Sequence, residues 1–159
     1  MRKWVASLAV VAMPSLADGG SPLSFGTYAG MSKEELSESV VLTEESEEDG
    51  KSVYTSPQAP DNTYRADKYG YELGETGLCR VVAMFSDVRS TGNTFSLDIA
   101  RRYGKPARYE GEEFPAHETV HYPSSQYRLA DGVQDLLIAQ LAPLDRARVM
   151  YLFENYPDC

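Results

Sequence analysis

Strand-like patterns of apolar and polar positions over residues 64–73 and 78–88 predict two strands, joined by a four-residue turn at residues 74–77. The second run is apolar at nearly every position, with Arg80 as its one early exception. Strands that are covered on both faces have this composition. We therefore expect residues 78–88 to form a central strand of a sheet.

Two later stretches, residues 134–141 and 146–155, also show strand-like patterns, with a break at residues 142–145. In the last stretch large apolar side chains point alternately to two faces: Val149, Tyr151 and Phe153 to one, Met150 and Leu152 to the other. This stretch is therefore also expected in the interior of the sheet. Residues 107–113 are predicted to begin a further strand.

A short helix over residues 33–39 is predicted by its start signals. Ser32 is placed as the N-cap, and Glu35 three residues later completes a capping box. Met31 and Leu36 occupy the two positions of a hydrophobic staple, which fixes the direction in which the chain enters the helix.

A second helix is predicted over residues 93–103. Apolar side chains recur at every fourth position: Phe95, Ile99 and Tyr103. Arg101 and Arg102 favour the C-terminal end of the helix dipole. The alternation over residues 95–99 also fits a strand, but Gly104 and Pro106 end the segment in the order typical of a helix.

These elements predict a fold of the α+β class, with two helices packed on a mostly antiparallel sheet of about five strands. A helix followed by strands occurs twice, although no internal repeat is clear at the level of single residues. The single domain is expected to span residues 31–159, after a Gly-, Ser- and Pro-rich segment, residues 18–30, that we expect to be flexible. Residues 43–50 predict a solvated acidic loop, because their acids lack the alternating spacing of a calcium-binding loop.

The first seventeen residues have the three parts of a secretory signal. Arg2 and Lys3 are basic, and residues 4–13 form the apolar run. After Pro14, residues 15–17 (Ser-Leu-Ala) place small side chains at the −3 and −1 positions of a cleavage site. The apolar run is about half as long as a membrane-spanning helix requires. Because no Cys stands at the cleavage site to carry a lipid, we expect a soluble periplasmic or secreted protein without a stable membrane anchor.

The formal net charge of −9 excludes some classes of partner. Nucleic acid requires clustered Lys and Arg on the protein surface, and so does an electrostatic hold on an anionic membrane. We therefore expect a partner that is neither a nucleic acid nor an anionic membrane.

The chain has two cysteines, Cys79 and Cys159. In an oxidising compartment an even count of two is most simply one disulfide. The competing interpretation is a pair of free thiols, one of them reactive. Without a CxxC spacing, nothing supports a redox or zinc-ribbon role.

One motif points to chemistry: residues 117–121 read His-Glu-Thr-Val-His, the HExxH pattern of zinc hydrolases. On a helix, His117 and His121 would share one metal while Glu118 acts as general base. Pro115 and Pro123 leave room for at most about two turns, and such a short helix is marginal unless it is packed. No third His exists, and a downstream acid such as Asp131 would have to supply the remaining ligand. We therefore expect a surface loop or extended segment, and no metal or other cofactor.

Three short motifs resemble a family of small uncharacterised exported bacterial proteins. They are Gly-Leu-Cys-Arg-Val-Val-Ala at residues 77–83, Tyr-Gly-Lys-Pro at residues 103–106, and Tyr-Leu-Phe-Glu-Asn at residues 151–155, shortly before Cys159. The resemblance runs in order over residues 25–159. It supports the pairing of Cys79 with Cys159 and the predicted strands, and it implies no activity.

Residues 30–36, Gly-Met-Ser-Lys-Glu-Glu-Leu, also look like the helix start of small outer-membrane assembly lipoproteins of the SmpA/OmlA type. In that group the helix packs on a three-stranded sheet. The lipid-bearing Cys of the group is missing here, so the likeness implies similar local architecture and not a similar role.

The sequence contains no GxSxG elbow, no Gly-rich phosphate loop and no Cys beside a plausible base. We therefore expect a non-catalytic module that binds another envelope or secreted protein. Two alternatives stay open. One is a zinc-dependent hydrolase that uses His117, Glu118 and His121. The other is an inhibitor or immunity protein whose contact is the acidic segment 44–49.

Overall fold

The computed structural model describes residues 20–86, 93–109, 118–141 and 146–159. The predicted secretory signal, residues 1–17, lies outside these residues. The order of elements is α1 (Lys33–Ser39), β1 (Thr43–Glu48), β2 (Lys51–Ser56), β3 (Lys68–Gly74), β4 (Gly77–Phe85), α2 (Asn93–Tyr103), β5 (Ala107–Arg108), β6 (Glu118–Pro123), β7 (Val133–Leu141) and β8 (Arg146–Phe153), with 3₁₀ turns at Pro22–Ser24 and Tyr156–Asp158.

All strands join one antiparallel sheet, in the order β1-β2-β3-β4-β8-β7-β6-β5. Seven of these strands have at least six residues, and β5 has two. The predicted α+β class with two helices is confirmed, but the predicted count of about five strands is wrong. The central position of β4 and the interior position of β8 are confirmed, because each strand pairs on both sides.

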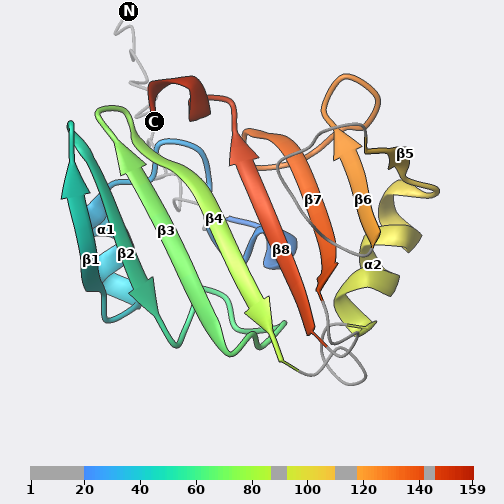
Figure 1. The fold of residues 1–159 in the computed structure, drawn as a ribbon, viewed down its shortest axis with the longest axis horizontal. Helices are drawn as coiled ribbons and strands as arrows, with labels where there is room; N and C mark the ends of the chain where they lie inside the picture. Colours follow the sequence, from blue (N-terminus) through green and yellow to red (C-terminus); the bar gives the residue numbers. More distant parts are fainter. Residues whose placement is uncertain (1–19, 87–92, 110–117, 142–145) are drawn as a thin grey trace, which may run out of the picture.

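Both helices lie behind the sheet in Figure 1, α1 at the β1–β2 end and α2 at the β6–β5 end. Each helix matches its predicted range. The capping box of α1 is formed as predicted: Ser32 accepts from the Glu35 N–H, and Glu35 accepts from the Ser32 N–H. At the end of α2, Gly104 has φ +81° and donates to the Ala100 carbonyl.

The acidic stretch is not the predicted loop. Residues 43–48 form β1, an edge strand whose six residues are all exposed, and Asp49 and Gly50 make the turn to β2. Both turn residues have positive φ, 51° and 77°, which is the backbone that an Asp-Gly hairpin turn requires. The hairpin partner β2 was also not predicted.

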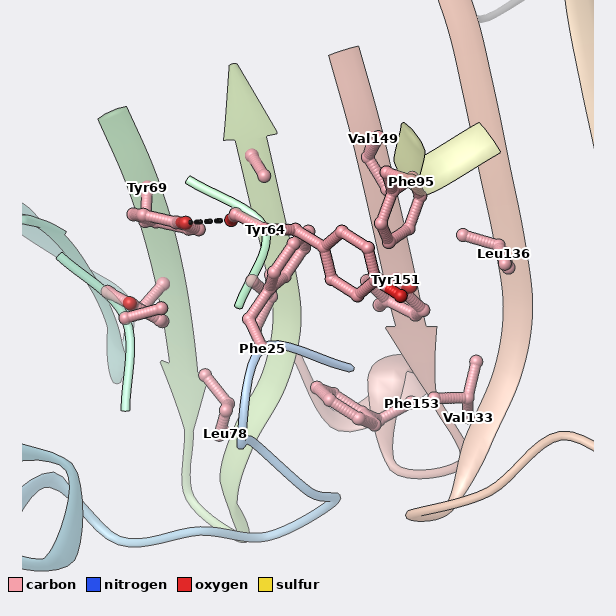
Figure 2. Close-up of a cluster of buried hydrophobic side chains, with 14 of the residues drawn as sticks. Phe25, Tyr64, Tyr69, Leu78, Phe95, Val133, Leu136, Val149, Tyr151 and Phe153 are labelled. Atoms are coloured by element: carbon pink, nitrogen blue, oxygen red, sulfur yellow. Dashed lines mark hydrogen bonds between the residues drawn. The ribbon is translucent and has the colours of Figure 1, made fainter. Parts of the chain in front are cut away.

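The entry segment is part of the core. Phe25 is completely buried, and its ring contacts the rings of Tyr69, Phe95 and Tyr151 at centroid distances of 5.3, 5.5 and 5.6 Å (Figure 2). The prediction of a flexible segment over residues 18–30 is therefore wrong for residues 20–30. The carboxylate of Asp131 helps to hold this segment, because it accepts from the Ser21 N–H at 2.9 Å and from the Ser24 hydroxyl at 2.5 Å.

The sheet consists of two similar halves. Each half is a helix followed by a four-strand meander, and the last strands of the two meanders, β4 and β8, pair at the centre. The register is symmetric about the pair Val82–Met150, since Arg80 pairs with Leu152 and Arg148 pairs with Met84. Residues 80–85 (Arg-Val-Val-Ala-Met-Phe) thus correspond to residues 148–153 (Arg-Val-Met-Tyr-Leu-Phe). The twofold occurrence of a helix followed by strands is an internal repeat.

Candidate functional site

The HExxH segment does not have the geometry of a zinc hydrolase. Residues Glu118–Pro123 form strand β6, so the helix that would bring two imidazoles to one metal is absent. His117 lies outside the described residues, and so does the side chain of Glu118. The extended conformation that we expected for this segment is confirmed for β6. The zinc-hydrolase alternative loses the helix on which it depends.

His121 is instead one member of a cross-strand pair. Its Nε2 lies 2.7 Å from Oδ1 of Asp135 on β7, and the ring of Tyr109 meets the imidazole edge-on at 5.8 Å. The pair lies on the face of the sheet opposite the helices. Within the described residues, Asp135 is the hydrogen-bond partner of His121, and no hydroxyl or thiol bonds to the imidazole.

Asp131, the acid considered as a third metal ligand, has partners other than His121. Its carboxylate is engaged by the Ser21 and Ser24 donors described above. In the part of the chain that the structure covers, no group of three or more His, Cys, Asp or Glu residues could hold a metal ion. Asp135, which sequence reasoning did not single out, is the acid that contacts His121.

Cys79 and Cys159 form a disulfide. Their Cα atoms are 6.3 Å apart, across a sequence separation of 80 residues. Cys79 on β4 is completely buried and Cys159 is 8% exposed. The bridge fastens the chain after β8 to the centre of the sheet. Its burial fits a structural bond rather than an exchanging thiol.

The central strands carry a strip of partly exposed side chains on the face away from the helices. On β4 and β8, Val81, Ala83, Val149 and Tyr151 belong to the hydrophobic core, so the alternating positions point the other way. Met150, which pairs with Val82 at the middle of this face, is buried, and we call the positions around it the central strip: Arg80, Val82, Met84, Arg148 and Leu152. All five are partly exposed. In Figure 1 this is the near face of the sheet, and neither labelled helix crosses it.

The two arginines of the central strip are equivalent by the internal repeat but differ in their partners. Arg80 forms an ion pair with Glu72 on β3. The register places Ala139 beside Arg148 where Glu72 stands beside Arg80. Arg148 directs its Nε at the sulfur of Met84, 3.4 Å away. The repeat of Arg-Val and Phe at residues 80–85 and 148–153 is the sequence signal that could have identified this pair.

The larger cavities lie away from the central strip. One, of about 470 Å³, is lined by Lys33, Tyr54 and the β3–β4 turn. Another of about 470 Å³ is lined by residues that include Leu23, Tyr64 and Arg101. The Tyr64 hydroxyl donates to Asp98 at 2.7 Å, and burial together with this bond raises the pKa of Tyr64 to about 12. A tyrosine held neutral in this way is a structural hydrogen-bond donor and not a base.

The chain matches no known protein family, no curated protein and no solved structure. Among the described residues, no helix is long and apolar enough to cross a membrane.

Proposed function

We propose that this chain is an exported, non-catalytic protein-binding module of the cell envelope, and that it binds its partner through the central strip. The observation that carries the proposal is the second face of the sheet. Around the buried Met150, this face partly exposes Val82, Met84 and Leu152 together with two arginines. Methionine and arginine are enriched where proteins contact one another, and a partly exposed apolar centre gains free energy when a partner covers it.

Two further observations support the proposal. The N-terminal residues have the composition of a secretory signal, and a buried disulfide is typical of proteins that fold in an oxidising compartment. Within the described residues, the side chains best suited to acid–base chemistry hold one another in place: His121 hydrogen-bonds to Asp135, and Asp98 accepts from Tyr64 and from Arg101. These contacts support a binding role over a catalytic one.

Site-directed photo-crosslinking tests the proposal. A photoreactive phenylalanine analogue replaces Leu152 in the central strip, and in a matched control it replaces Leu97 on α2, which is 48% exposed. Both proteins are irradiated in envelope extract of the producing organism. We expect one defined protein adduct from position 152 and none of that mass from position 97. Equal adducts from both positions, or no adduct from position 152, would contradict the proposal.

The inhibitor alternative predicts a different contact, the acidic edge strand β1. If β1 is part of the contact, replacing Glu44 and Glu47 with Lys should abolish the adduct formed at position 152. If the central strip alone binds, the adduct yield should stay the same.

A further inference from the structure

Within the described residues, Arg148 forms no ion pair, although it corresponds by the internal repeat to the paired Arg80. In the first half, the guanidinium of Arg80 is neutralised by Glu72, whose side chain is only 14% exposed. In the second half, Ala139 occupies the position equivalent to Glu72. Within the described residues, the ion pairs are those of Lys68, Arg80, Arg101 and His121, and none includes Arg148.

The described cross-strand neighbours of Arg148 are apolar. Its cross-strand neighbours are Met84 on β4 and Ala139 on β7, and Val82 and Leu152 lie on the adjacent rungs of the same face. A partner that covers this region removes water from the guanidinium. Such desolvation costs free energy unless the partner brings a carboxylate. A guanidinium and a carboxylate can form two parallel hydrogen bonds, which offset this cost.

We infer that Arg148 receives a carboxylate from the bound protein, and that the contacting segment of that protein presents this carboxylate among apolar side chains. The inference rests on the proposed function and names the chemistry of the partner. A second copy of the chain fits less well, because the central strip would present two arginines to Arg148 and Glu72 is already paired. An acidic membrane fits less well too, because the net charge of −9 opposes it.

The probe for the test is a library of random twelve-residue peptides displayed on phage, selected against the full chain. Three proteins are compared: the unchanged chain, Arg148→Gln, and the control Arg146→Gln. Arg146 lies on the same strand and is exposed, so its removal takes away one positive charge beside the strip while Arg148 and the apolar positions stay in place. Circular dichroism of each protein confirms that it is folded.

We expect the selected peptides to contain Asp or Glu flanked by apolar residues. Their affinity should fall about ten- to hundredfold for Arg148→Gln, the cost of losing one charge-assisted pair, and should stay unchanged for Arg146→Gln. Peptides without an acidic residue, or with equal affinity for Arg148→Gln, would overturn the inference while leaving the proposed function standing. Saturable binding of oleate that Arg148→Gln abolishes would also overturn it, because the acid would then be a lipid.

The crosslinking experiment distinguishes a failure of the proposed function from a failure of the carboxylate inference. If position 152 yields no protein adduct, the proposed function fails and this inference fails with it. If position 152 yields the same amount of adduct in Arg148→Glu, the central strip binds a partner, but the partner does not supply a carboxylate to Arg148. An adduct with twice the mass of the chain would identify a second copy as the occupant and overturn the inference.

Discussion

Phe25 connects the two halves of the sheet at the scale of a single side chain. Its ring touches Tyr69 of the first half and both Phe95 and Tyr151 of the second. The backbone at Phe25 has φ +58°, a conformation that costs free energy for any residue with a side chain. The packing of the ring has to offset this cost, so Phe25 is expected to be one of the most important residues for stability.

We predict that Phe25→Ala lowers the free energy of unfolding by about 3–5 kcal/mol, the usual range for removing a buried phenylalanine. Urea denaturation followed by circular dichroism measures the change. The control is Leu97→Ala on α2, which should change stability by less than about 0.5 kcal/mol because Leu97 is 48% exposed. A change of similar size in both variants would show that residues 20–30 do not belong to the core.

Glu35 makes the start of α1 sensitive to acid. Its carboxylate accepts from the Ser32 N–H and from the Tyr28 and Ser32 hydroxyls, and these bonds hold the pKa of Glu35 below its ordinary value of 4.5. A carboxyl whose pKa is lower in the folded state contributes stability above its unfolded-state pKa and loses it as the pH falls through the folded-state pKa.

Glu35→Ala should therefore destabilise the protein at pH 7, and the difference from the unchanged chain should shrink as the pH falls below about 4.5. Ser32→Ala should cost about 1 kcal/mol at pH 7 by removing the N-cap. Unfolding free energies measured from pH 7 to pH 3 check both expectations. The control is Glu34→Ala, which removes an acid from the same turn without breaking the capping box. Its difference in unfolding free energy from the unchanged chain should not shrink in this way.

The elements that sequence reasoning located have local signals of their own. The capping box of α1, the glycine after α2 and the apolar run of β4 each act over a few residues, so they could be recognised without knowledge of the fold. β1 has no apolar residue, and its strand conformation comes from pairing with β2. Its remaining signal was the turn Asp49-Gly50. In the HExxH segment, the prolines correctly argued against a helix, but the pairing of β6 with β7 was not predictable from them.

The acids of β1 protect an open sheet edge. Edge strands expose unpaired N–H and C=O groups on which other chains can add strands, and charged side chains oppose such pairing. We predict that the double variant Glu44→Thr/Glu47→Thr self-associates at concentrations at which the unchanged chain does not. Sedimentation velocity at equal protein concentration measures this.

The matched control for the edge is Glu34→Thr/Glu38→Thr on α1. It removes the same charge from exposed positions that border no open edge. If the control associates to the same degree, net charge and not the edge is the cause, and the protective role of β1 is wrong.

At the scale of the whole molecule, the internal repeat explains why the candidate surface could not be located from the sequence. The correspondence between residues 80–85 and 148–153 rests on one Arg-Val pair and one Phe, with substitutions between them. Only the pairing of β4 with β8 aligns the two segments and shows that Arg80 has Glu72 while Arg148 has Ala139. The difference between the halves, rather than their similarity, is what led us to propose the central strip as the binding surface.

The disulfide joins these halves covalently, since Cys79 belongs to the central strand of the first half and Cys159 follows the last strand of the second. A bridge that closes about eighty residues restricts the unfolded chain and is expected to stabilise the fold by about 4 kcal/mol. The double variant Cys79→Ala/Cys159→Ala should therefore unfold at a lower urea concentration than the oxidised protein.

The slope of the unfolding free energy against urea should change at the same time, because the unbridged chain exposes more surface when it unfolds. Mass spectrometry after alkylation supplies the direct check: the protein unfolded in urea without reductant should gain no alkyl group, and it should gain two once reduced. Two alkyl groups gained without reductant would contradict the bridge. A double variant as stable as the unchanged chain would instead show that packing alone holds the chain after β8 against β4.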